Sequence, residues 1–232
     1  LMELYKSRLS VRITPYKYYE EEEIFAHEFA YELTKDQKRA INDITEDLSK
    51  DIPMDRLLCG DVGFGKTEVA LRTMFKAILN NKQVIYLCPT TILSKQQYNV
   101  ALKRFALWPV NIKLYNRFTT QKEEKNIIEG LEKGTIDIVF GTHKLLNNKL
   151  VYKRLGLLII DEEQRFGVKH KEIIKEMKKD INVLTLSATP IPRTLKMALS
   201  GLKNLSIIET GPNNRYPVQT YVVSEDELII KD

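Results

Sequence analysis

The sequence predicts an α/β fold in which a mostly parallel sheet is covered by helices on both faces. Short, almost continuous apolar runs recur along the chain, and these are typical of strands that are buried on both sides. Amphipathic helical patterns separate the runs, so each connection can cross over and return the chain parallel. A glycine-rich motif of the phosphate-binding type also joins one of these strands directly to a helix.

Local sequence patterns predict where each helix and each strand lies. Thr120 and Glu123 have the spacing of a capping box, and Gly134 is a typical stop for the helix that they begin. Asn80-Asn81 interrupts the helix that follows the glycine-rich motif. The predicted helices cover residues 36–49, 68–79, about 91–105, about 121–133 and about 169–179. The predicted strands cover residues 56–59, 83–88, 110–114, 136–140, 155–160, 182–186, 206–209 and 219–223.

Composition narrows the class of protein. The 232 residues suffice for one large α/β domain or two small ones, and 43% of them are hydrophobic, enough for a packed core. No run approaches the length of a membrane span and no signal peptide opens the chain, so we expect no membrane contact and a cytoplasmic location. The two cysteines, Cys59 and Cys88, lack metal or redox spacing and are expected to be buried in a reducing compartment.

The chain divides into three parts. Residues 1–30 form a lead-in helix and linker with tyrosines and an acidic run at 20–23, either a solvated linker or an interaction surface. Residues 31–223 form the alternating domain, in which predicted strands and helices follow one another in turn. Residues 224–232 begin a further linker. The opening Leu1-Met2 leads us to expect a piece of a longer protein. The net charge of +5 is compatible with nucleic acid but barely favours it.

Residues 60–67 match the phosphate-binding P-loop, G-x-x-x-x-G-K-[ST]. Glycines let the backbone wrap closely and direct N–H groups at a polyphosphate. Lys66 supplies a positive charge, and the Thr67 hydroxyl can ligate Mg²⁺. The helix that follows presents the positive end of its dipole to the same anion. The predicted nucleotide-binding loop comprises Gly60, Asp61, Val62, Gly63, Phe64, Gly65, Lys66 and Thr67.

A second motif ends the strand at 155–160. Asp161 is placed to hold Mg²⁺, directly or through water, and Glu162 to orient the attacking water. Acids are also common at solvated strand ends, but the P-loop favours the functional interpretation. The sequence lacks the Asn-Lys-x-Asp motif expected of a GTPase and the Leu-Ser-Gly-Gly-Gln signature expected of an ABC-type ATPase. The two motifs therefore predict a bound nucleotide with Mg²⁺, and the family resemblance carried by the further motifs implies that the nucleotide is ATP.

Several motifs together resemble those of superfamily 2 helicases. Asp161-Glu162-Glu163-Gln164 is similar to their DExH/DExQ box, and Ser187-Ala188-Thr189 to their motif III. Residues 89–93 resemble motif Ia, and Gly141-Thr142-His143 a later DNA-contacting loop. Residues 33–37 resemble the adenine-reading Q motif. The wider runs 54–70, 141–146, 161–168 and 188–195 resemble bacterial transcription-repair coupling factors and the related RecG helicases. Residues 105–110 favour the coupling factors.

The resemblance implies a RecA-like P-loop NTPase lobe and assigns roles. Gln37 would read the adenine, with Tyr31 packing near the base, while Phe29 is expected in the core. Lys66, Asp161, Glu162 and Gln164 would form the catalytic set, although many relatives have His where Gln164 stands. Coupling of the nucleotide state to DNA would involve Ser187, Thr189 and Arg193. Contacts to DNA phosphates would involve Thr90, Thr91, Arg117, Thr142, His143 and Lys144.

The resemblance also implies partners and an activity. The parent would be a DNA-dependent ATPase that moves along double-stranded DNA and displaces stalled RNA polymerase, so coupling transcription to repair. A second RecA-like lobe, and domains that bind RNA polymerase and repair proteins, would lie outside this chain. Two alternatives stay open: a RecG-like fork-remodelling helicase, or an isolated nucleotide- and DNA-binding module without useful turnover. The lysines on the helix at 169–179 form either a basic patch or, as we favour, a solvated face.

Overall fold

The computed structural model describes residues 10–147, 149–188 and 204–212, and it confirms the predicted α/β fold. The strands are β1 (Asp55–Gly60), β2 (Gln83–Leu87), β3 (Ile112–Tyr115), β4 (Ile138–Gly141), β5 (Leu155–Asp161), β6 (Asn182–Ser187) and β7 (Asn204–Ile208). They form one sheet in the order β3-β4-β2-β5-β6-β1-β7, and each pairing is parallel. The strand predicted at 219–223 lies outside the described residues.

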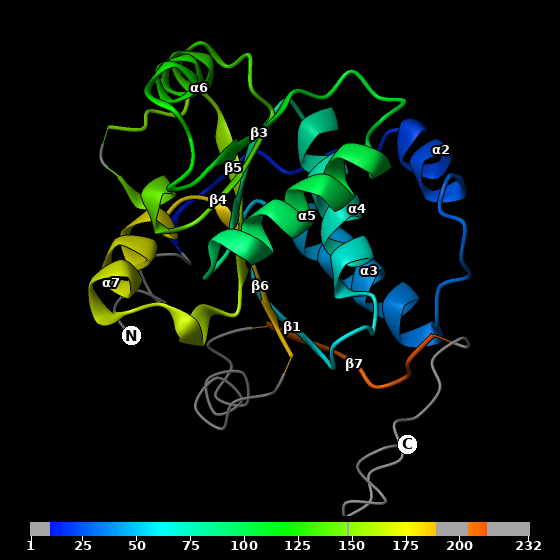
Figure 1. The fold of residues 1–232 in the computed structure, drawn as a ribbon. Coiled ribbons are helices and arrows are strands. Elements are labelled where there is room, and N and C mark those ends of the chain that lie inside the picture. Colours follow the sequence, from blue (N-terminus) through cyan, green and yellow to red (C-terminus); the bar gives the residue numbers. More distant parts are fainter. Residues whose placement is uncertain (1–9, 148, 189–203, 213–232) are drawn as a thin grey trace, which may run out of the picture.

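Helices cover both faces of the sheet, as Figure 1 shows with the sheet seen nearly edge-on. One face carries α3 (Lys35–Leu48), α4 (Lys66–Leu79) and α5 (Thr91–Arg104). The other carries α6 (Gln121–Lys133), η1 (His143–Leu146), η2 (Glu163–Arg165) and α7 (Val168–Met177). Successive side chains of a strand point to opposite faces. In β2, Tyr86 therefore enters the core under α4 and α5, while Ile85 enters the core under α6 and α7.

Local signals place the helix ends close to their predicted positions. The Thr120 hydroxyl accepts a hydrogen bond from the Glu123 N–H at 3.3 Å, and the Glu123 carboxylate accepts one from the Thr120 N–H at 2.9 Å. Gly134 ends α6 in the left-handed region, at φ 75°. Thr34 and Gln37 make a second capping box at the start of α3. These pairs satisfy backbone groups that the first turn of a helix leaves without partners.

The described part of the lead-in packs on the domain. Helix α2 (Glu21–His27) lies beside α4, and Phe25 is buried in the core. The Tyr16 hydroxyl donates to the carbonyl of Gly156, a residue far along the chain, at 2.9 Å. Lys76 of α4 pairs with Glu22 at 2.8 Å. The acidic run therefore forms a docked helix, an outcome that the sequence had left open.

The parallel order brings the motif-bearing loops to one edge. The P-loop follows β1, Asp161 ends β5 with Glu162 directly after it, and Ser187 ends β6. Because parallel strands end at the same side of a sheet, these loops meet at its carboxyl edge. Among the described residues, no helix is both long and apolar enough to cross a membrane.

Candidate nucleotide site

The P-loop has a backbone that only glycine adopts readily. Gly63 and Gly65 lie at φ 83° and 79°, and Gly65 occupies the N-cap position of α4. Gly60 lies against β7, where an added Cβ would come 3.1 Å from the Cβ of Ile208. The loop therefore turns tightly from β1 into the N-terminus of α4, the end of a helix that favours anions.

Lys66 lies within the curve of this loop. Its ammonium group donates to the carbonyls of Gly60 and of Asp61, the latter at 3.0 Å. Burial lowers the pKa of Lys66, and the nearby carboxylates of Glu162 and Asp161 oppose this shift. The lysine thus lies within electrostatic reach of both acids, although β6 separates β1 from β5 in the sheet. The two halves of the predicted site are brought together.

Asp161 is a poorly solvated acid. Burial, and then the neighbouring Glu162 carboxylate, raise its pKa to about 6, while Lys66 and Arg165 act in the opposite direction. A divalent cation would relieve this crowding of negative charge. Carboxylate and hydroxyl oxygens suit Mg²⁺, which uses few protein ligands when phosphates complete its shell. Within the described residues, no three His, Cys, Asp or Glu side chains cluster as a metal cage. Asp161 and Thr67 are the residues that would hold Mg²⁺ if a bound polyphosphate supplied further oxygens.

Glu162 connects the acid motif to β6. Its backbone is left-handed, at φ 50°, and its N–H donates to the Leu186 carbonyl at 2.9 Å. One carboxylate oxygen accepts from the Ala188 N–H at 2.7 Å, and the other accepts from the Gln164 side-chain amide. Through these two hydrogen bonds, Glu162 links Gln164 to the residue that follows β6. Ser187 is buried opposite Cys59 of β1, whereas Thr189 and Arg193 lie outside the described residues.

A cavity of about 1130 Å³ opens beside the P-loop. Tyr31 lines it and is 68% exposed, with the ring of Phe29 edge-on at 5.5 Å. Gln37 also lines it, but its amide is engaged: it donates to the Phe64 carbonyl and accepts from the Thr34 N–H, each at 2.9 Å. Gln37 therefore braces the P-loop, and its adenine-reading role stays a prediction. Phe29 is half-buried and lines the same cavity, with the Arg72 guanidinium 5.8 Å from its ring centre. It does not belong to the core clusters formed by the described residues, so its expected place in the core is wrong.

Sequence reasoning did not identify one wall of this cavity. Thr210 and Pro212, which follow β7, also line it. No motif marks these residues. The sequence did contain a signal for this wall, namely the strand predicted at 206–209. In a parallel sheet, that strand ends at the same carboxyl edge as the strand before the P-loop. The structure adds that β7 pairs directly with β1, so the residues after β7 lie next to the P-loop.

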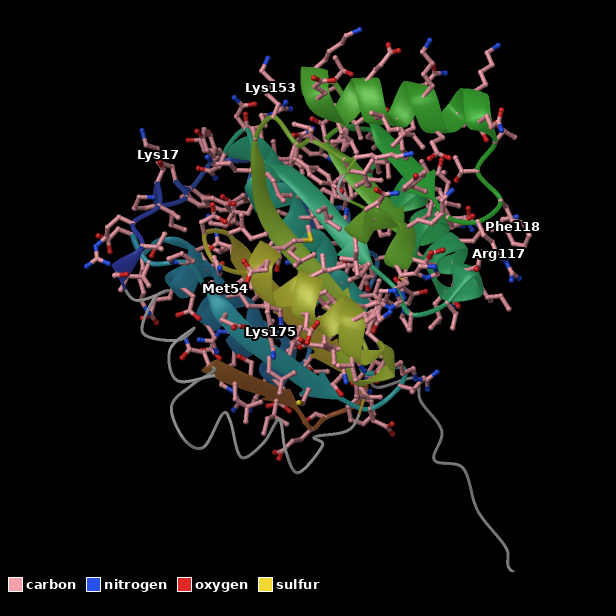
Figure 2. All side chains as sticks on the ribbon, turned by 90° about the vertical axis from the view of Figure 1, so that its left-hand side faces the viewer. Lys17, Met54, Arg117, Phe118, Lys153 and Lys175 are labelled. Carbon is pink, nitrogen blue, oxygen red and sulfur yellow. The ribbon has the colours of Figure 1, made fainter. Side chains whose placement is uncertain are left out.

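The predicted DNA-contacting residues lie on the loops after β2, β3 and β4, which are neighbours in the sheet. Arg117 is exposed and its guanidinium lies 4.8 Å from the ring centre of Phe118; both protrude from the edge of the molecule in Figure 2. His143 stacks on His170 at 5.0 Å, and burial lowers the pKa of His143.

The other members of this set have protein partners. The exposed Thr90 caps α5 by accepting from the Leu93 N–H at 3.2 Å, and Thr91, the first residue of α5, is half-buried. Thr142 is buried, and Lys144 pairs with Glu124 at 3.4 Å.

The lysines of α7 and its C-terminal end differ from one another. Lys178 is buried and pairs with Glu163 at 2.7 Å, and Lys179 pairs with Glu176. Lys169 and Lys175 are exposed. Because two of the lysines face carboxylates, the segment is not a continuous basic patch. The solvated-face interpretation fits the exposed positions and is wrong for Lys178.

Comparison with known proteins agrees with this geometry. The model of the DEAD/DEAH box helicase family matches residues 34–198. The transcription-repair-coupling factor of Staphylococcus epidermidis is 55% identical over 233 residues, which are all of this chain and 20% of that protein. The factor from Staphylococcus aureus is 54% identical over 235 residues. The chain thus spans about a fifth of the length of these relatives.

Solved structures give the same picture. RecG bound to a three-way DNA junction superposes with a TM-score of 0.80 at 34% identity, covering 94% of this chain and 31% of RecG. The DUF1998 helicase MrfA bound to DNA, at 18% identity and a TM-score of 0.61, shares the fold. The resemblance drawn from the motifs is confirmed. The chain therefore belongs to the DEAD/DEAH box helicase family and forms a RecA-like lobe of a superfamily 2 motor.

Proposed function

We propose that this chain is the ATP-binding lobe of a double-stranded DNA translocase that couples transcription to DNA repair by displacing stalled RNA polymerase. Identity of 55% along the whole chain to a transcription-repair-coupling factor supports this assignment. The observation that carries the chemistry is that the P-loop after β1 and the acids at the end of β5 lie at the same carboxyl edge of the sheet, with Lys66 within electrostatic reach of Asp161 and Glu162. Such a motor of bacterial type would act in the cytoplasm.

In this proposal Lys66 and the P-loop amides hold the phosphates, and Thr67 and Asp161 hold Mg²⁺. The metal would offset negative charge on the phosphates when it is bound. Glu162 orients the attacking water, and its hydrogen bond from the Ala188 N–H ties that role to the end of β6. A change at the γ-phosphate can then be transmitted to β6 through Glu162, which is the type of two-state element that coupling requires.

The contacts to DNA would be made to phosphates, independently of sequence, by the loops after β2, β3 and β4. A second RecA-like lobe, RNA polymerase and repair proteins would be engaged by the remaining length of a protein like the relatives. The 34% identity to RecG supports a second candidate, a fork-remodelling helicase lobe. The third is a module that binds nucleotide and DNA without useful turnover, which we expect of this lobe alone.

The nucleotide site is tested with Lys66→Ala. The substitution removes a charged donor to the phosphates, an interaction of about 1.5–3 kcal/mol, so ATP binding should weaken about tenfold to a hundredfold. Isothermal titration calorimetry with Mg-ATP measures this change. Lys169→Ala, at an exposed lysine of α7, is the control and should bind ATP normally. Unchanged ATP affinity in Lys66→Ala would reject the site.

Two further assays separate the candidate functions. ATP turnover measured with and without duplex DNA distinguishes a working motor lobe from a binding module, since strong stimulation by DNA contradicts the module. Competition between a three-way junction and a linear duplex distinguishes the two motors. A marked preference for the junction favours fork remodelling, and equal affinity favours a translocase that moves along a continuous duplex.

A further inference from the structure

The segment that follows β7 is fixed to the start of α3 by one carboxylate. Oδ2 of Asp36 accepts hydrogen bonds from the Glu209 N–H at 3.1 Å, the Thr210 N–H at 3.0 Å and the Thr210 hydroxyl at 2.9 Å. Oδ1 pairs with Arg39 at 2.9 Å. These bonds, with that of the Thr210 hydroxyl first, lower the pKa of Asp36. Hydrogen bonds to an ionised acceptor are among the stronger ones in proteins, so residues 209–210 are firmly held.

This segment closes one side of the cavity next to the P-loop. Thr210 and Pro212 line the cavity together with the start of α3 and the P-loop glycines Gly63 and Gly65. Gly211 lies against the ring of Phe64, where an added Cβ would come 3.2 Å from Cε1. Gln37, the residue after Asp36, donates to the Phe64 carbonyl. Adjacent residues at one helix end therefore position two walls of the cavity.

Holding β7 in the sheet does not require Asp36. Farther along α3, Asp43 accepts from the Ser206 hydroxyl at 2.7 Å, and Asp47 accepts from the Asn204 side chain at 2.9 Å. These bonds, with the ladder to β1, already attach the strand. Asp36 acts beyond the last residue of β7, Ile208, where the chain leaves the sheet and meets the cavity. Its hydrogen bonds thus shape the cavity rather than the strand.

We propose that residues 209–212 form a wall of the nucleoside subsite and that Asp36 and Thr210 are positioning residues for the base and ribose of a bound nucleoside triphosphate. This inference rests on the proposed nucleotide site, in which the P-loop holds the phosphates. It divides recognition into two parts with different residues. The P-loop determines affinity for the triphosphate, and the wall held by Asp36 determines the additional affinity that the nucleoside provides.

Two probes separate these parts: Mg-ATP, and inorganic tripolyphosphate with Mg²⁺, which lacks base and ribose. Calorimetry is done on the wild-type protein, Asp36→Ala and Thr210→Val. We expect ATP to bind about tenfold more weakly in Asp36→Ala, and less markedly so in Thr210→Val, while tripolyphosphate affinity stays within about twofold. Asp43→Ala is the matched control, because it removes another α3–β7 contact away from the cavity. It should lower stability in urea unfolding and leave the ratio of the two affinities unchanged.

The outcomes are distinct. An unchanged ratio of ATP to tripolyphosphate affinity in both Asp36→Ala and Thr210→Val overturns the proposal, as does an equal loss of both probes. Thr210→Val removes a single hydroxyl, so it keeps the test valid if Asp36→Ala does not fold. Lys66→Ala is measured in parallel. Undiminished tripolyphosphate binding in that variant rejects the proposed nucleotide site itself, whereas a normal Lys66 effect with an unchanged ratio rejects only the wall.

Discussion

At the scale of single residues, Glu162 stands out because its backbone is strained. A left-handed conformation costs a residue other than glycine about 1–2 kcal/mol, and Glu162 adopts it at φ 50°. The conformation is held by the hydrogen bonds that its backbone and carboxylate make with Leu186 and Ala188 of the adjoining β6 segment. In this strained conformation, the Glu162 carboxylate lies between the acid motif and the end of β6.

We predict that Glu162→Gln separates binding from hydrolysis. The amide keeps the size of the side chain and an oxygen for the Ala188 N–H, but it is a poor base, so hydrolysis should fall about a hundredfold or more. ATP affinity should change little, because Lys66 and Thr67 are untouched. Single-turnover hydrolysis, with protein in excess over nucleotide, measures the rate even where it is slow.

Glu163→Gln is the control for that experiment. Glu163 is the next acid in the chain, but its carboxylate pairs with the buried Lys178. Its loss should reduce the free energy of unfolding and leave the rate of hydrolysis largely intact. Equal losses of rate in the two variants would show that general negative charge, rather than the placement of Glu162, supports hydrolysis.

The contacts of Gln37 and Asp36 show which features of single residues the sequence alone does not predict. The pattern around Gln37 identifies the family motif, because the motif spans only a few positions. The capping box of Gln37 with Thr34 is equally local but was found only in the structure. The contacts of Gln37 with Phe64, and of Asp36 with Thr210, join residues separated by 27 and 174 positions. Such contacts depend on which strands become neighbours, and local pattern carries no information about that order.

At the scale of elements, α2 belongs to the core. The ring of Phe25 stacks on Phe75 of α4 at 4.3 Å and lies 5.1 Å from Phe105, at the end of α5. The guanidinium of Arg104 covers the same ring at 3.6 Å, and also pairs with Glu68 in the first turns of α4. A short helix with a mostly acidic surface is therefore anchored through one aromatic side chain.

We predict that Phe25→Ala lowers the free energy of unfolding by about 3–5 kcal/mol, the usual cost of truncating a buried phenylalanine. Urea denaturation monitored by circular dichroism measures the change. Ile24→Ala is the matched control, because Ile24 is on the same helix but 55% exposed, so its truncation should cost well under 1 kcal/mol. Similar midpoints for the two variants would mean that α2 is not part of the cooperative unit.

The elements of the alternating domain were predictable, whereas the docking of α2 was not. Buried parallel strands and capped helices leave signals within a few residues, as at Thr120 and Gly134. In α2 the apolar content is too small for a clear helical stripe, and the run of glutamates suggests solvent. Its position is determined by a tertiary pocket among Phe75, Phe105 and Trp108, residues that come together only after the sheet and helices have assembled.

At the scale of the whole molecule, strand order divides the carboxyl edge into two neighbouring regions. The loops after β1 and β7 border the candidate nucleotide site together with the described end of β6, and the loops after β2, β3 and β4 carry the predicted DNA contacts. Strand β5 lies between the two regions and ends at Asp161, with Glu162 directly after it. The parallel sheet thus places the predicted hydrolytic residues between the candidate nucleotide site and the predicted DNA contacts.

The division predicts that a DNA contact can be removed without loss of nucleotide binding. Arg117, which is exposed on the loop after β3, gives the clearest test. Arg117→Ala should weaken the binding of duplex DNA. It should also reduce the slope of log affinity against log salt concentration by about 1, because one phosphate contact is lost. Fluorescence anisotropy of a labelled duplex across a salt series measures both quantities. Lys17→Ala is the control, since Lys17 is exposed on the opposite side of the view in Figure 2. An unchanged salt slope in Arg117→Ala, or an equal reduction of the slope in Lys17→Ala, would place the duplex elsewhere on the lobe. Loss of ATP binding in Arg117→Ala would contradict the separation of the two regions.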